Sequence, residues 1–257
     1  MSDFNNDIIF TIGRMNPPTT GHMKLIEKMM ETALETNVNK IYIILSATVD
    51  REKNPLECID KRKLLLNFII DKVKTNILDK KKHTKSEINK IIIEIICTND
   101  PKIKINAKNP IFKTILFMIQ ENNPSNIQLI IGEDRINDYN WIEDYIKPVT
   151  FLTPIDLKRK TKKDSKNPEN EKEAMSATKM RKLAIDGLFD EFSNEMIPTG
   201  IDAENIKEIY DTIRDPKVTE SNTKSRKTKR PSQSTEKETK KTRAGKKTYK
   251  KYRFIKK

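Results

Sequence analysis

The stretch that decides the fold is IIFTIGRMNPPTTGHMKLIEKMMETALET, residues 8–36. It opens with an apolar run at residues 8–12, which is typical of a buried strand, and Gly13 ends that run. Apolar residues then recur at the three- and four-residue spacing of an amphipathic helix over residues 22–36. A buried strand that turns directly into a helix predicts the first half of a β-α-β unit.

The same alternation continues along the chain. Because strands and helices alternate, the pattern predicts an α/β domain with a doubly wound, mainly parallel five-stranded sheet, helices on both faces, and further helices at the C-terminal end. Ligands of such sheets bind beyond the carboxyl ends of the strands. The further strands are predicted at residues 41–45, 91–97, 127–131 and 149–152, and the further helices at 64–77, 111–119, 136–146, 177–184 and 204–213.

The positive charge of the chain is concentrated at its end. The 257 residues carry a formal net charge of +14, and Lys217–Lys257 alone contains 17 basic and 3 acidic residues. The balanced remainder disfavours a basic nucleic-acid-binding fold. We expect one domain at 1–215, with a polar insertion at 156–173 and a helical part at 176–214. We expect residues 216–257 to be a disordered Lys/Arg-rich tail and a candidate non-specific nucleic-acid contact.

Cysteine and histidine are rare. Cys58 and Cys97 are too few for a disulfide framework and have no CxxC spacing, so we interpret them as structural or surface residues. His22 and His83 cannot build a His-rich metal site. No apolar run approaches the roughly 20 residues of a membrane span, and no secretory signal is visible at the N-terminus. We expect an intracellular protein, cytoplasmic or, through its basic tail, nuclear.

The turn between the first strand and helix has the features of a phosphate site. Gly13 allows close approach of a ligand, and the free N–H groups of the helix start attract anions. Thr19 or Thr20 can cap the helix, and His22, three residues after Thr19, can face the same anion. Arg14 adds a planar cation. The stretch matches neither the Walker loop nor GxGxxG.

A second phosphate clamp is predicted at MSATKMRKLA, residues 175–184. Ser176 can cap a helix there, and Thr178 and Arg181 lie three residues apart on one face. Together the two stretches resemble the nucleotidyltransferase superfamily, whose motifs are (H/T)xGH and ISxTxxR. The lead-in to Thr19 looks like that of archaeal-type nicotinamide-mononucleotide adenylyltransferases and of related phage and large-DNA-virus enzymes. A Rossmann-like fold is implied.

The resemblance also implies roles for individual residues. His22, Thr19 and Arg181 would be catalytic. Ser46, Arg62 and Trp141 would contact the acceptor, with Trp141 stacking on a pyridine ring; the alternative for Trp141 is simple packing on a helix. The nucleotide would be held by the remaining motif residues, Gly13, Arg14, Asn16, Gly21, Gly132, Asp134, Ser176 and Thr178.

The implied reaction is attack by an acceptor phosphate on the α-phosphorus of a nucleoside triphosphate, with release of pyrophosphate. ATP and nicotinamide mononucleotide are the expected substrates, with Mg²⁺ carried by the triphosphate and no organic cofactor. One alternative is a cytidylyltransferase for a phosphoalcohol or sugar phosphate. Another is a non-catalytic nucleic-acid-binding protein on a relic fold. The residue pattern leaves the oligomeric state open.

Overall fold

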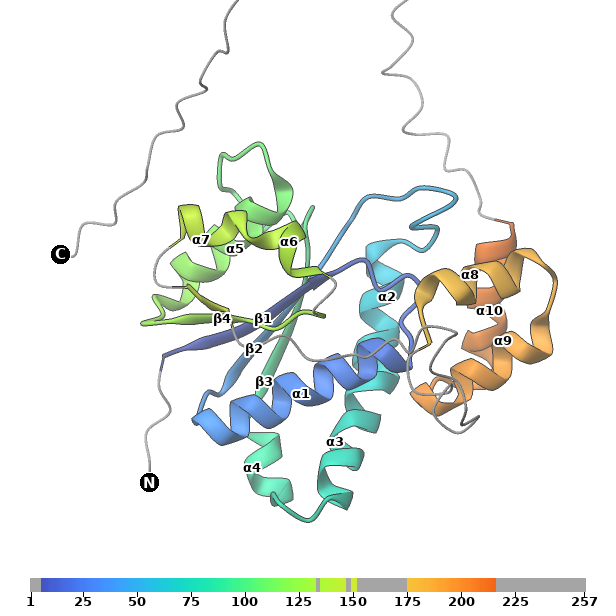
Figure 1. The fold of residues 1–257 in the computed structure, drawn as a ribbon, viewed down its shortest axis with the longest axis horizontal. Coiled ribbons are helices and arrows are strands. Elements are labelled where there is room, and N and C mark those ends of the chain that lie inside the picture. Colours follow the sequence, from blue (N-terminus) through green and yellow to red (C-terminus); the bar gives the residue numbers. More distant parts are fainter. Residues whose placement is uncertain (1–5, 133–134, 147–148, 152–174, 216–257) are drawn as a thin grey trace, which may run out of the picture. The chain divides into compact units, whose positions relative to one another are not determined.

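The central sheet is parallel throughout, with strand order β3-β2-β1-β4-β5 (Figure 1). The structure is a computed structural model, and it describes residues 6–132, 135–146, 149–151 and 175–215. The α/β class and the parallel sheet are confirmed. The strands are β1 (Ile8–Gly13), β2 (Lys40–Leu45), β3 (Ile92–Cys97), β4 (Ile127–Leu129) and, as a three-residue pairing at the edge, β5 (Val149–Phe151).

Helices cover both faces of the sheet, as predicted. Side chains along each strand point alternately to the two faces, and both sets are apolar, so each face needs a covering layer. Ile41 and Ile43 point into one core, whereas Tyr42 and Ile44 point into the other. The first core is covered by α1 (Thr20–Thr36), α2 (Cys58–Leu64), the π-helical turn η1 (Leu65–Ile69), α3 (Ile70–Asp79), α4 (Lys85–Asn89), α8 (Ala177–Ile185), α9 (Phe189–Met196), the 3₁₀ turn η4 (Ile197–Thr199) and α10 (Ala203–Arg214). The second core is covered by α5 (Pro110–Asn122), α6 (Ile136–Tyr139) and α7 (Trp141–Tyr145).

The helices differ from the sequence prediction in several places. Residues 79–90, where no helix was predicted, contain α4, because Thr84 caps it and the Glu87 carboxylate accepts the Thr84 backbone N–H at 2.7 Å. The helix predicted at 64–77 begins earlier, at Cys58, and includes η1. The single helix predicted at 136–146 is two short helices, α6 and α7. The sequence analysis missed α9, whose Phe192 and Met196 are buried.

The two cysteines form a disulfide between the start of α2 and the end of β3. The sequence analysis, which interpreted the cysteines as structural or surface residues, did not predict this bond. The β2–β3 register sets Cys97 beside Leu45, and α2 returns over the same strand end, so residues 39 apart in sequence meet. The expected intracellular location, which rested partly on cysteine content, stays a prediction.

The 156–173 insertion and the 216–257 tail lie outside the described residues, and the nucleic-acid contact expected of the tail stays a prediction. In the part of the chain that is described, no helix combines the length and hydrophobicity that crossing a bilayer requires. The fold places the carboxyl ends of β1, β2 and β4 at one edge of the sheet, next to the start of α8.

Candidate active site

A cleft of about 400 Å³ lies at the carboxyl end of β1, where the strand order changes direction between β1 and β4. Parallel sheets of this kind place ligand sites at such a switch point. The cleft brings together most of the residues predicted from the sequence, although they come from distant parts of the chain. Those that line it are Gly13, Arg14, Asn16, Thr19, Gly21, His22, Ser46, Gly132, Ser176, Thr178 and Arg181.

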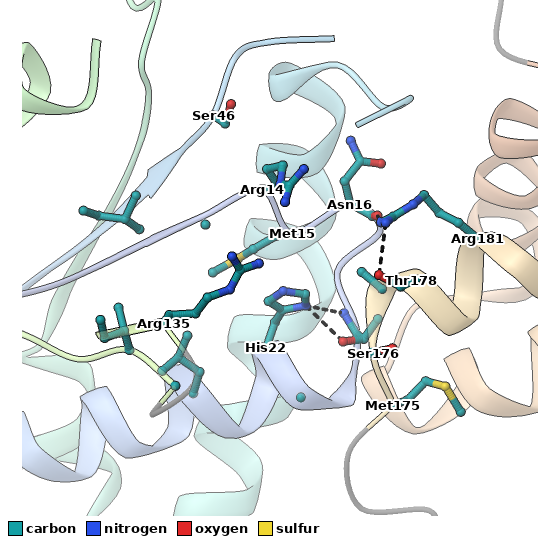
Figure 2. Close-up of a pocket in the computed structure, with 18 of the residues that line it drawn as sticks. Arg14, Met15, Asn16, His22, Ser46, Arg135, Met175, Ser176, Thr178 and Arg181 are labelled. Atoms are coloured by element: carbon teal, nitrogen blue, oxygen red, sulfur yellow. Dashed lines mark hydrogen bonds between the residues drawn. The ribbon is translucent and has the colours of Figure 1, made fainter. Parts of the chain in front are cut away.

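His22 is held in a defined orientation at the start of α1. It is the third residue of the helix, and its Nδ1 accepts the backbone N–H of Thr19 at 3.1 Å. The hydroxyl oxygen of buried Thr19 lies 3.0 Å from the same nitrogen (Figure 2). Since Nδ1 is an acceptor here, the neutral ring carries its proton on Nε2. Thr19 therefore orients the imidazole, and its predicted contact with a triphosphate stays a prediction.

The second predicted clamp lies directly against the first. Ser176 caps α8 as expected, accepting the Lys179 backbone N–H at 3.2 Å. The Arg181 guanidinium donates to the Asn16 carbonyl oxygen at 2.6 Å and to the Thr178 hydroxyl at 3.2 Å (Figure 2).

The two clamps approach each other closely at Gly21. A Cβ added at Gly21 would lie 3.4 Å from the backbone oxygen of Met175, the residue just before the Ser176 cap. The lead-in to α8 therefore packs directly on the first turn of α1.

The electrostatics of the cleft favour an anion. Arg14, Arg135 and Arg181 line it, and no carboxylate does so among the residues that the structure describes. Burial lowers the pKa of Arg181, and the charge of Arg14 lowers it further, while Asp50 opposes the shift. Figure 2 shows Arg14, His22 and Arg135 facing the same space. Because the charge of Arg14 acts on Arg181, a multiply charged anion between the two would stabilise both.

Of the predicted acceptor residues, one lines the cleft and two are not among the described lining residues. Ser46 lines the cleft, but Trp141 is not among the described residues that do so. The Trp141 ring packs edge-on against Phe112, with 6.1 Å between centroids, and its indole N–H donates to the Asp138 carbonyl at 3.1 Å. Arg62 is not among the described lining residues either, and Asp134 falls outside the described part of the chain.

Three residues that the sequence analysis missed belong to the site or its support. Arg135 and Tyr139 line the cleft beside Gly132. Burial raises the pKa of the Tyr139 phenol, so the ring stays neutral. Lys61, the neighbour of Arg62, is fully buried behind Ser46. No sequence signal distinguishes these three from surface residues, because one follows a turn and the others sit on charged helices.

The described residues form no metal site of their own at the cleft. Across the described residues, no group of three His, Cys, Asp or Glu side chains is arranged to hold a metal ion. Hard cations such as Mg²⁺ need oxygen ligands, and the described lining offers no carboxylate. These residues do not make a magnesium site.

Comparison with known proteins gives likenesses among solved structures alone. No protein-family model matches the chain, and no curated protein sequence matches it. Among solved structures, the chain is similar to a protein from Vibrio parahaemolyticus provisionally assigned as a nicotinate-nucleotide adenylyltransferase. The sequences are 13% identical, the TM-score is 0.43, and the match covers 79% of this chain and 97% of that chain. So distant a likeness does not determine function, which has to be inferred from the side chains.

Proposed function

We propose that this protein is a nucleotidyltransferase that moves a nucleoside monophosphate from a nucleoside triphosphate to a phosphate-bearing acceptor. The observation that carries the proposal is the junction of the two predicted clamps. His22, Arg14 and Arg181 meet at one carboxylate-poor cleft, and Arg181 is hydrogen-bonded to the Asn16 backbone, 165 residues away in sequence. Such a set of donors suits a polyphosphate.

In the proposed reaction, an acceptor phosphate oxygen attacks the α-phosphorus of the triphosphate. A new oxygen–phosphorus bond forms, the bond between the α-phosphorus and the bridging oxygen breaks, and pyrophosphate leaves with the electron pair. No protein nucleophile is required. Catalysis consists of positioning the two substrates and stabilising the charge that develops on the phosphates.

The residues divide this work by their position. His22 has its proton on Nε2 and donates it as a hydrogen bond to an α-phosphate oxygen, while Thr19 holds the ring. Arg14, Arg181 and the capped start of α8, with Ser176 and Thr178, hold the β- and γ-phosphates. Mg²⁺ enters as part of the triphosphate substrate.

The particular substrates are proposed from the sequence resemblance: ATP as the donor and nicotinamide mononucleotide as the acceptor. The test is a screen of four nucleoside triphosphates against a panel of phosphomonoesters, with pyrophosphate release as the readout. We expect release that depends on both substrates and is largest for ATP with nicotinamide mononucleotide. Turnover with CTP and a phosphoalcohol would show instead that the protein is a cytidylyltransferase. No release from any pair would refute the proposal.

Arg181→Lys is expected to weaken triphosphate binding by about 10–100-fold, although it keeps the positive charge. The guanidinium uses one N–H group on the Asn16 carbonyl and another on Thr178. An ammonium cannot keep both contacts and still present a planar face to phosphate. The KM for the triphosphate measures the effect, and Lys182→Ala, an exposed cation at the next position, is the control. Equal KM values for Arg181→Lys and the parent would contradict the clamp.

Tyr139→Ala is expected to raise the KM of one base-bearing substrate about tenfold, because its ring lines the cleft and can stack on a base. Trp141→Ala is expected to leave both KM values within about threefold of the parent. It should instead lower the free energy of unfolding by about 1–3 kcal/mol through lost ring contacts with Phe112 and Tyr145. The opposite pattern would restore Trp141 as the stacking residue.

A further inference from the structure

Lys61 is an unusual lysine, fully buried on α2 next to the cleft. Its ammonium donates to the Ser46 carbonyl oxygen at 2.9 Å and to the Asn54 side-chain oxygen at 3.1 Å. Both acceptors are neutral. Among the described residues no carboxylate is a hydrogen-bond partner of Lys61 or acts on its pKa, so little in the protein offsets the lost hydration of its charge.

A continuous series of hydrogen bonds connects Lys61 to the cleft. Asn54, also fully buried, accepts a second hydrogen bond from the Asn16 amide nitrogen. Asn16 in turn donates to the Leu56 carbonyl at 3.0 Å and accepts the Leu56 backbone N–H at 3.2 Å. The Arg181 guanidinium donates to the backbone carbonyl oxygen of the same Asn16. A buried network that is fully hydrogen-bonded rigidifies the groups it joins.

We propose that Lys61 is a positioning residue for polyphosphate binding: it fixes Ser46 at one wall of the cleft and, through Asn54 and Asn16, the carbonyl group that holds Arg181. The inference rests on the proposed function and adds a residue to which the sequence resemblance gave no role. Lys61 is not among the described residues that line the cleft, so it acts through its neighbours and through its charge.

If the charge of Lys61 matters, the affinity of the cleft for anions depends on pH, which a purely structural role would not produce. Burial, and next the charge of Arg14, lower the pKa of Lys61 to about 8. Arg14 is the charged group that acts on it, and its two hydrogen-bond partners do not titrate. Lys61 is cationic below that pKa and neutral above it, so affinity for an anion in the cleft should fall as the pH rises through about 8.

Two variants on α2 test the proposal, with MgATP as the probe. Lys61→Met keeps the apolar stem and removes the donor and the charge. It should raise the KM and the Kd for MgATP about tenfold and change kcat by less than about threefold, since a ground-state contact is lost. Lys63→Met, a largely exposed lysine two residues away, should match the parent. Circular dichroism and thermal unfolding report whether each variant is folded.

The pH arm uses the parent protein, so it does not depend on any variant folding. Between pH 7 and 9.5 the Kd of the parent for MgATP should rise at least about fivefold, whereas Lys61→Met and Lys61→Arg should give flat profiles. A flat parent profile, or a folded Lys61→Met with unchanged KM, would overturn the role of Lys61 and leave the proposed function standing. A parent that neither binds MgATP nor releases pyrophosphate with any triphosphate would remove both.

Discussion

Replacing His22 with alanine is expected to slow nucleotidyl transfer by about 10²–10³-fold, the usual loss when one oriented, charge-stabilising donor is removed. The Thr19 backbone and hydroxyl hold Nδ1, which leaves Nε2 as the proton-bearing nitrogen of a side chain that lines the cleft. The loss should appear in kcat, because charge on the α-phosphate oxygens develops mainly in the transition state. Pyrophosphate release under saturating substrates measures it.

Two further variants separate catalysis from helix capping. His22→Gln keeps a side-chain oxygen that can accept the Thr19 N–H, so it should preserve thermal stability and still lose turnover. His83→Ala removes the only other histidine, which lies between α3 and α4 rather than among the described lining residues, and should have no effect. If His22→Gln retained parental turnover, the imidazole would have no part in the reaction.

Loss of the Cys58–Cys97 disulfide is expected to lower the free energy of unfolding by about 2–4 kcal/mol, or the melting temperature by about 5–15 °C. The bond closes a loop between residues 39 apart in sequence, and that loop restricts the unfolded chain. Both cysteines are buried in the larger core, so the paired variant Cys58→Ala/Cys97→Ala is preferable to one that introduces hydroxyl groups. Thermal melts with and without dithiothreitol measure the effect.

The matched controls for this prediction are internal. The parent should show no titratable thiol until it is reduced and denatured, and reduction should shift its melting temperature. The alanine pair should melt at the same temperature in both buffers. A parent whose melting temperature ignored dithiothreitol, or whose thiols reacted without reduction, would show that the two cysteines are not bonded in solution.

Much of the fold could be predicted because its signals are local. The apolar run at Ile8–Gly13 followed by the helical spacing of α1 is sufficient to predict a β-α-β unit, and the later strands repeat the pattern. Two of the failures have local causes as well, and the third does not. The helix α4 was missed because its Thr84–Glu87 cap lies in a lysine-rich stretch. The helix α9 was missed because it is short and has only two buried apolar residues. The disulfide depends on strand register, which no spacing rule reveals.

The candidate site, like the fold, was predicted from the sequence only in part. His22, Ser176 and Arg181 were predicted because helix starts impose characteristic residues at fixed spacing. Lys61, Arg135 and Tyr139 were missed because their importance arises from tertiary placement alone. In sequence, Lys61 is one cation in an Asp-Lys-Arg-Lys run, and only the packing of α2 shows that it, and not Arg62, is the buried one.

The measurement that tests the central claim most directly is the fate of labelled phosphate. The protein is incubated with acceptor and with triphosphate labelled at either the α- or the γ-phosphate, and the products are separated. The account predicts that the α-label enters the acceptor product, that the γ-label leaves as pyrophosphate, and that His22→Ala slows both together. Transfer of the γ-label to the acceptor, or release of either label as free phosphate without an acceptor product, would contradict it.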